Sequence, residues 1–428
     1  MTNIYVLPTA VTIKGLCYCV TLRIVTSRIL RRSATSLIRF NGTLTKEQLS
    51  TDEVGKIVIP APVPGKIQAA VLKKFSEPLA IENVEPPKLL QSNEVLIDVD
   101  YCALNGSDIL LTDNAYSHQP SLPAILGYEV VGKLLQVGDE AKKDGYKVGD
   151  RVVALNRERY GGLAEQCSAE IGDIWKIPGS LKMVDVVCLL NNYMKALIGL
   201  QQQAHLEEDE MVLINVGLGG AGLAAVDIAT NVFRSLVIGV SATEERANLV
   251  RDKGAFASLK FHERQLMKQI AEVAAERDIA GVFEGVDGEN FKKILDCFTD
   301  IYKPEFQRQM LRDDNFAVLV QHLSREGRVI VVGIAPTRTE EQTDKNAFTP
   351  SGIDIRQYRK KNHESYHEAG QEILEYFEEN LISPTPSMIA GLYNVNEAIK
   401  FMSDLKNFGK VKKSTRSLST SMNRYIIY

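Results

Sequence analysis

One segment limits what this chain can fold into more than any other: residues 211–230. There, an apolar strand pattern runs into the turn Gly217-Leu-Gly219-Gly-Ala-Gly222 and then into an alanine-rich helix pattern. In a G-x-G-x-x-G turn the first glycine permits the tight turn, the second lets the backbone approach a pyrophosphate, and the third lets helix and strand pack closely. The amides and dipole at the helix start favour that anion. The segment predicts a dinucleotide-binding βαβ unit; the alternative is a glycine-rich turn that binds no ligand.

The next strand pattern, at 236–240, bears on the choice between the two nicotinamide cofactors. An NAD site usually places an acidic residue about 20 residues past the glycines, where it binds the ribose hydroxyls. Here Ser241 follows the strand and Arg246 lies beyond it. No carboxylate therefore repels a 2′-phosphate, and a guanidinium is placed to pair with one, which favours NADPH over NADH. As alternatives, Ser241 and Glu244 also fit a helix capping box, and Arg246 also fits a solvated helix position.

The chain around this unit shows two kinds of pattern. Residues 67–171 read as short β-branched strands separated by turn residues, which indicates a β-rich domain. From about residue 195, helical patterns alternate with apolar strands, which indicates a parallel sheet covered by helices. The expected strands are Ile67–Leu72, 94–99, 128–137 and Arg151–Leu155 in the first part and Met211–Val216, 236–240, 281–286 and 328–334 in the second, with helices later at 366–380 and 395–405.

Composition excludes several classes of protein. The 428 residues are 45% hydrophobic and 24% charged, which is typical of a globular rather than a disordered chain. The formal charge of −4 gives no reason to expect a nucleic-acid partner. No apolar run reaches the roughly 20 residues of a membrane span. The six cysteines include no C-x-x-C pair, which argues against a disulfide framework and the usual structural zinc knuckle.

The first 46 residues differ in charge from everything after them. Glu47 is the first acidic residue, whereas the stretch before it contains seven Lys and Arg residues. An acid-free leader with Arg and Ser is typical of an organelle transit peptide, and its apolar residues between 25 and 40 fall opposite its arginines on a helix. We therefore expect a mitochondrial leader over 1–46 and import into the matrix. A disordered basic tail and a secretory signal are the alternatives.

Five further motifs, together with the glycine turn, make residues 67–411 resemble the medium-chain dehydrogenase/reductase superfamily. Within it, the segments 222–234, Ala164-Glu-Gln-Cys167 and Ile174-Trp-Lys-Ile-Pro178 resemble the zinc-free quinone oxidoreductase branch. The resemblance implies a GroES-like catalytic domain, a Rossmann domain with a doubly wound parallel sheet, an active site in the cleft between them, and a homodimer formed through the Rossmann sheet. The motifs are Ala103-Leu-Asn105-Gly-Ser-Asp108, Gly127-Tyr-Glu129-Val-Val-Gly132, Val148-Gly-Asp-Arg-Val152, Gly161-Gly-Leu-Ala-Glu165 and Phe408-Gly-Lys-Val411.

This resemblance, with the leader, gives a division of the whole chain. In the superfamily the catalytic domain is interrupted by the Rossmann domain and resumes after it. The expected parts are a transit peptide at 1–46, a linker at 47–66, the first part of the GroES-like domain at 67–194, the Rossmann domain at 195–335, the return of the catalytic domain at 336–411 and a basic tail at 412–428.

The resemblance also bears on zinc. Zinc-dependent members have a Cys where this chain has Asn105, a His where it has Tyr128, and another Cys near Asn191. Amide and phenol groups are poor zinc ligands beside thiolate and imidazole, and a catalytic site needs three protein ligands. Glu129 is a single remaining carboxylate. We therefore expect no metal.

Without an electrophilic metal, the substrate must itself accept hydride readily. Quinones and α,β-unsaturated carbonyls do so because conjugation stabilises the negative charge that forms. The hypothesis is that NADPH delivers hydride to such a substrate and that the proton comes from solvent or from Tyr116. By resemblance, Asn105, Asp108 and Tyr116 line the substrate cleft. Asn105 would hold a carbonyl oxygen or an amide, and Asp108 would orient Asn105 or backbone rather than transfer a proton.

Four departures from the family leave a non-catalytic alternative open, namely an NADPH-binding redox sensor or partner-binding module. Met194-Lys195 replaces a small Gly-Thr pair beside the nicotinamide, Asn191-Asn192 makes that segment polar, 299–320 is an excursion, and the final strand pattern ends at Lys410-Val411 and runs into a basic tail. A lysine at position 195 would either add positive charge near the cofactor or point away from it. The expected cofactor-binding residues are Gly217, Gly219, Gly220, Ala221, Gly222, Ser241, Arg246, Lys195 and Gly333.

Overall fold

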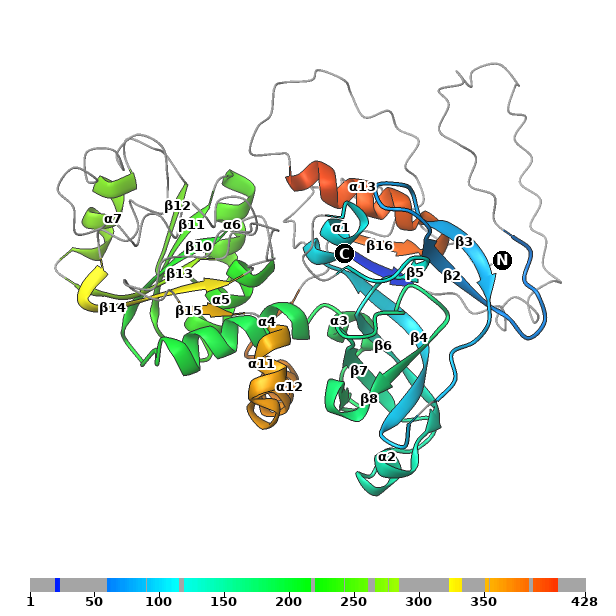
Figure 1. Ribbon diagram of the computed structural model, residues 1–428. Helices are drawn as coiled ribbons and strands as arrows, with labels where there is room; N and C mark the ends of the chain where they lie inside the picture. Colours follow the sequence, from blue (N-terminus) through cyan, green and yellow to red (C-terminus); the bar gives the residue numbers. More distant parts are fainter. Residues whose placement is uncertain are drawn as a thin grey trace, which may run out of the picture.

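Two lobes make up the described part of the chain, and Figure 1 shows them side by side, joined by helix α4 (Leu190–Leu197). One lobe is built on antiparallel strand pairs and the other on a parallel sheet. One cluster of buried hydrophobic residues includes members of both lobes. The computed structural model describes residues 20–23, 60–89, 91–114, 119–216, 220–241, 243–260, 266–275, 277–284, 323–332, 351–353, 355–384 and 388–406.

The first lobe holds a seven-stranded and a three-stranded sheet in its described part. Val, Ile and Leu dominate its strands, and β2 is buried over its whole length because both faces are covered. All its pairs are antiparallel except that of β1 with β16. The larger sheet runs β16 (Met388–Gly391), β1 (Val20–Arg23), β4 (Glu94–Leu104), β6 (Glu129–Val137), β7 (Arg151–Leu155), β9 (Ile174–Lys176), with β8 (Gln166–Glu170) on β4; the smaller runs β3 (Ala80–Val84), β2 (Ile67–Leu72), β5 (Ala124–Ile125).

The second lobe is a six-stranded sheet in which every neighbouring pair is parallel. In chain order its strands are arranged 3-2-1-4-5-6, the order of a doubly wound dinucleotide-binding fold, in which ligands bind where the strand order reverses. That reversal lies between β10 and β13. The strands are β12 (Ala257–Lys260), β11 (Leu236–Ser241), β10 (Met211–Val216), β13 (Ile279–Glu284), β14 (Leu323–Val332) and β15 (Ser351–Ile353), and the helices are α5 (Gly220–Asn231), α6 (Glu244–Asp252) and α7 (Leu266–Ala274).

After β15 the chain returns to the first lobe. Helix α13 (Val395–Lys406) packs against α1 (Gly106–Thr112), and Asn396 exchanges hydrogen bonds with the backbone of Leu79. None of the described helices is long and apolar enough to cross a membrane. The other described helical segments are α2 (Asp139–Lys143), Ile171–Asp173, α3 (Met183–Val186), Ile198–Gln203, α11 (Ile355–Lys361), α12 (His363–Glu378) and Leu392–Asn394.

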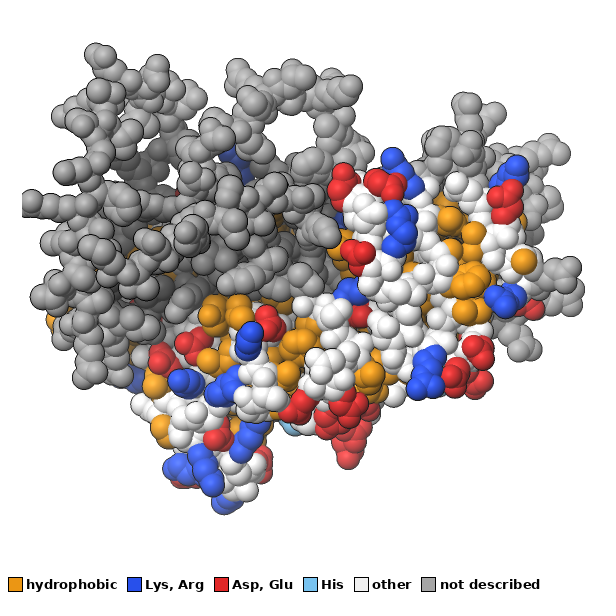
Figure 2. Space-filling model, turned by 180° about the vertical axis from the view of Figure 1, so that it is seen from behind, with side chains coloured by type: hydrophobic (Ala, Val, Ile, Leu, Met, Phe, Trp, Pro, Cys, Tyr) orange, Lys and Arg blue, Asp and Glu red, His pale blue; other side chains and the backbone are white. Residues whose placement is uncertain are grey.

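Helix α12 locks this return segment to the first lobe. The Trp175 indole donates a 2.8 Å hydrogen bond to the His367 carbonyl, and a Cβ on Gly370 would come within 2.3 Å of that indole. Glycine at position 370 is therefore what allows the close approach. The opposite face is acidic: in Figure 2 red side chains gather along the lower edge, where α12 exposes Glu364, Glu368, Glu375 and Glu378, followed by Glu379 just beyond the helix.

The sequence predicts eight of the sixteen described strands and misses the other eight, β1 among them. The ranges Ile67–Leu72, Arg151–Leu155 and Met211–Val216 are confirmed at both ends. The prediction that residues 1–46 lie outside the fold is corrected by β1 (Val20–Arg23), which lies between β4 and β16 in the larger sheet. Its four residues were too short a pattern to separate from a basic leader. The excursion at 299–320, the 408–411 motif and the tail at 412–428 lie outside the described residues.

Candidate active site

Helix α1 begins where β4 ends, and the turn between them is held by a buried carboxylate. Asp108 accepts hydrogen bonds from the backbone N–H of Asn105 at 2.9 Å and of Gly127 at 3.2 Å. Its side chain is fully buried, and that burial raises the pKa of Asp108 to about 6, although the two backbone donors oppose the shift. Asp108 therefore ties the start of α1 to the loop before β6, which fixes the position of the Asn105 side chain.

Asn105, Glu129 and Asn191 form a closed, buried ring of hydrogen bonds. Asn105 Nδ2 donates to Glu129 Oε2 at 2.9 Å, Asn191 Nδ2 donates to Asn105 Oδ1 at 2.7 Å, and the Asn191 backbone N–H donates to Glu129 Oε1 at 2.8 Å. Burial raises the pKa of Glu129 to about 7, against the effect of these donors and of the nearby Arg157 and Lys195 charges. The ring joins the end of β4 to the starts of β6 and α4.

Arg157 extends this ring to a tyrosine. Its guanidinium lies 4.2 Å from the Tyr128 ring centroid and donates to the Tyr128 hydroxyl at 3.1 Å and to the Asn191 amide oxygen. The Ser107 and Tyr128 hydroxyl oxygens are 2.7 Å apart. Burial raises the pKa of Tyr128 well above its usual value, so the phenol is protonated and able to donate. Asn105, Tyr128 and Asn191, which the sequence singles out together, thus meet in one hydrogen-bonded cluster.

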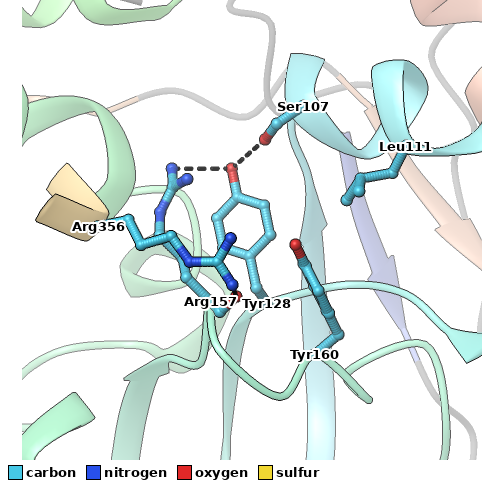
Figure 3. A pocket seen from close by; sticks show the side chains of 6 residues that line it. All are labelled: Ser107, Leu111, Tyr128, Arg157, Tyr160 and Arg356. Carbon is cyan, nitrogen blue, oxygen red and sulfur yellow. Dashed lines mark hydrogen bonds between the residues drawn. The ribbon is translucent and has the colours of Figure 1, made fainter. Parts of the chain in front are cut away.

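A pocket opens beside this cluster. Figure 3 shows the Arg157 and Arg356 side chains on one side of the Tyr128 ring and Tyr160 and Leu111 on the other. Arg356 comes from α11, far along the chain, and its Nε lies 2.6 Å from Glu158 Oε1. The pocket encloses about 210 Å³ of space, part of it open to solvent, and is lined by Ser107, Leu111, Tyr128, Arg157, Tyr160 and Arg356.

The cofactor side of the site is partly described. Gly220, Ala221 and Gly222 form the first turn of α5, whereas Gly217 and Gly219 lie outside the described residues. A Cβ on Gly220 would come within 2.4 Å of Asn192 Nδ2, so only glycine lets α4 lie this close to the start of α5. Because Asn191 and Asn192 are adjacent on α4, the start of α5 and the polar cluster are joined through one short helix.

The structure after β11 contradicts the two alternative interpretations of Ser241 and Arg246, the capping box and the solvated helix position. Ser241 is buried and donates to the Thr243 carbonyl at 3.4 Å, and Thr243, not Ser241, caps α6 by accepting from the Arg246 backbone N–H. The Ser241–Glu244 capping box is therefore wrong. Arg246 is only 3% exposed, so the alternative of a solvated helix position is wrong as well. Its role toward a 2′-phosphate stays a prediction.

Comparisons with known proteins agree with this architecture. Residues 91–193 match the family model "Alcohol dehydrogenase GroES-like domain". The chain is 27% identical to quinone oxidoreductase-like protein 2 of Bos taurus over 82% of this chain and 93% of that one, and 31% identical to the quinone oxidoreductase of Mus musculus over 57% and 65%. A probable oxidoreductase from Mycobacterium abscessus superposes with a TM-score of 0.64 at 22% identity, over 80% of this chain and 97% of that one. A mycobacterial protein complexed with NADPH superposes with a TM-score of 0.62 at 20% identity, over 79% and 97%.

The chain has the fold of the medium-chain dehydrogenase/reductases. The resemblance inferred from its motifs is confirmed, and its quinone oxidoreductase relatives support an oxidoreductase. Among the residues that the structure describes, no group of three or more His, Cys, Asp or Glu side chains is arranged to hold a metal ion.

Two cationic residues lie in or near the candidate site, one predicted from the sequence and one missed. Lys195 on α4 is partly buried, and its charge opposes the rise in the pKa of Glu129. Whether it contacts a cofactor stays a prediction. Arg157 was missed because it lies in a short loop after β7 with no motif around it. Only its contacts to Tyr128 and Asn191 identify it. Tyr116 and Gly333 lie outside the described residues.

Proposed function

We propose that this protein is a zinc-independent, NADPH-dependent reductase of quinones or α,β-unsaturated carbonyls. The observation that carries the proposal is the cluster of Asn105, Tyr128 and Asn191, which occupy positions of zinc ligands in related dehydrogenases. Here their polar groups are engaged with one another, with Glu129 and with Arg157. A cluster of amide and phenol groups provides hydrogen-bond donors for a substrate oxygen, but not the thiolate and imidazole that zinc prefers.

The residues at the start of α5 fit a dinucleotide. Gly220 has no Cβ in the space beside Asn192, and the following residues begin a buried helix whose first amides suit a pyrophosphate. When bound, the nicotinamide supplies the hydride. The Asn192 amide on α4 lies against this helix start and accepts from the Asn191 amide at 3.5 Å, so it would contact the cofactor from the substrate side. Lys195 would do so from the same helix.

The substrate side would stabilise the negative charge that forms on a carbonyl oxygen. Tyr128 is the central donor because its phenol stays protonated and is held by Ser107 and Arg157. Glu129 acts through the amides: it fixes Asn105 and the Asn191 backbone by two hydrogen bonds, so their orientation does not depend on the substrate. The proton would enter from solvent through the open side of the pocket.

The test is NADPH consumption with 1,2-naphthoquinone and with an enal, together with metal analysis of the purified protein. We expect turnover without stoichiometric zinc. Tyr128→Phe removes one donor and should lower kcat by about 100-fold. Tyr146→Phe is the matched control, since that hydroxyl bonds the Ile174 carbonyl away from the pocket. One zinc per chain, or equal rates for the two variants, would contradict the proposal.

A second candidate is a non-catalytic NADPH-binding sensor or partner-binding module, and Asn192 is the observation in its favour. Its amide fills the space against Gly220. The same helix carries Met194-Lys195, at the positions where the family usually has a small Gly-Thr pair. Such a protein would bind NADPH and consume none with any member of a quinone and enal panel. Binding without consumption across that panel therefore separates the two candidates.

We further propose that the protein is imported into mitochondria and is a homodimer. The acid-free stretch before Glu47 supports import, whereas β1 (Val20–Arg23) sets its limit, because cleavage at 46 would remove the strand between β4 and β16. N-terminal sequencing of the protein from isolated mitochondria decides the matter: a mature end before Val20 keeps the strand, and one near residue 47 contradicts its place in the sheet. Light scattering in solution tests the dimer.

A further inference from the structure

The pocket beside Tyr128 has a chemical character that a site for a neutral quinone does not need. Two guanidinium groups, from Arg157 and Arg356, line it, and none of its six described lining residues is acidic. They come from different parts of the chain, one from the loop after β7 and one from α11, which the return segment brings against it. Two cations that line one cavity favour an anionic group there over a neutral one.

The rest of the lining fits a planar oxyanion on a short carbon chain. The Ser107 and Tyr128 hydroxyls lie on the same wall as the guanidinium groups, whereas Leu111 and the Tyr128 and Tyr160 rings, whose centroids are 6.5 Å apart, give apolar contact. Guanidinium and hydroxyl donors together match a carboxylate. Because the pocket is small and partly open to solvent, it suits one group of a substrate rather than the whole molecule.

Glu158 occupies the far side of Arg356 and shows that this guanidinium already pairs with a carboxylate. Its Oε1 lies 2.6 Å from Arg356 Nε, and its Oε2 accepts from Arg356 at 3.2 Å and lies 3.5 Å from Lys360 Nζ. Glu158 is thus shared by two cations. It holds Arg356 at the pocket wall from outside, since Glu158 itself is not among the residues that line the cavity.

We propose that this pocket is a carboxylate subsite and that the substrate is an enone or enal that carries a carboxylate, with Arg356 as a specificity residue. The inference rests on the proposed function. The carboxylate would seat against Arg356 and Arg157, which places the adjacent conjugated carbonyl at the Tyr128 hydroxyl. Hydride from NADPH would add to the electron-poor carbon of the C=C bond and a solvent proton to its neighbour, so the alkene is reduced and NADPH becomes NADP⁺.

The test compares trans-4-oxo-2-pentenoate with its methyl ester, which share the enone and differ in the charged carboxylate. We expect a kcat/KM at least tenfold higher for the acid. Arg356→Met should remove that preference by lowering kcat/KM for the acid more than for the ester, and Lys361→Met, an exposed cation on the same helix, should preserve it. An ester that is used as well as the acid, or a preference that survives Arg356→Met, would overturn the subsite.

A binding measurement separates this inference from the proposed function. Calorimetric titration with 4-oxopentanoate needs no turnover: the wild-type chain should bind it at least tenfold more tightly than Arg356→Met, and Lys361→Met should bind it as tightly as the wild type. Absence of turnover with normal 4-oxopentanoate binding would defeat the reductase and keep the subsite. Turnover of quinones, together with equal binding of 4-oxopentanoate by the wild type and Arg356→Met, would support the reductase and defeat the subsite.

Discussion

The two sides of the site are built in opposite ways. The cofactor side is local in sequence: a strand, a glycine turn and a helix within residues 211–231 form it, and a short sequence motif identifies it. The substrate side is assembled from β4, β6, the loop after β7, α4 and α11, segments separated by up to about 250 residues. A local site should tolerate changes elsewhere in the fold, whereas a site made of buried long-range hydrogen bonds should lose stability and activity together.

The largest effect that tests this contrast is expected at Glu129. Glu129→Leu leaves the Asn105 amide and the Asn191 backbone N–H without their acceptor in a buried place, which should cost about 2–5 kcal/mol of unfolding free energy. Urea denaturation measures it. Glu368→Leu, exposed on α12, is the control and should stay within about 0.5 kcal/mol of wild type. Equal losses for the two variants would show that the buried ring does not stabilise the lobe.

The second prediction uses the raised pKa of the same carboxyl. Because the pKa of Glu129 is about 7 in the folded chain and near 4.5 unfolded, the native state binds the proton more tightly. This contribution is fully present below pH 4.5 and is lost as pH rises through 7. Wild type should therefore lose about 3 kcal/mol relative to Glu129→Gln between pH 4.5 and 7. Unfolding curves across that range measure the difference, and a difference independent of pH would contradict the raised pKa.

A third effect, smaller in size, tests the junction between the two sides. Gly220→Ala would place a methyl group 2.4 Å from Asn192 Nδ2. We expect a loss of about 1–3 kcal/mol in stability and weaker NADPH binding, because α4 must move away from α5. Adding Asn192→Ala should restore most of the stability and of the NADPH affinity, since it removes the Nδ2 atom that the new methyl group would contact. Fluorescence titration of NADPH with the two single variants and the double variant measures the coupling, and additive losses would refute the contact.

The same contrast explains what the sequence could and could not predict. Met211–Val216 and the glycine turn could be predicted from the sequence because every residue involved is within one βαβ unit. Asn105 and Asn191 were singled out through family resemblance, but the ring that joins them to Glu129 depends on how β4, β6 and α4 meet. Arg157 and Arg356 carried no signal at all, because a pocket wall shared by distant segments leaves no spacing pattern. The strand β1 was missed for a different reason, because its four residues are too short a pattern to separate from a basic leader.

The smallest expected effect is on cofactor choice. It tests whether the residues that follow the glycine motif determine the preference for NADPH over NADH. Arg246 lies in the first turn of α6, after a strand end with no carboxylate. Arg246→Ala should weaken NADPH by about 1–2 kcal/mol more than NADH, since only NADPH has a 2′-phosphate to pair with a guanidinium. Arg251→Ala, an exposed arginine on the same helix that pairs with Glu244, is the control and should weaken neither. Titration of both cofactors into the three proteins gives the comparison. Equal weakening of NADPH and NADH by Arg246→Ala would mean that this buried side chain supports the helix start and does not read the phosphate, and the cofactor preference would then have to come from contacts that the strand end does not reveal.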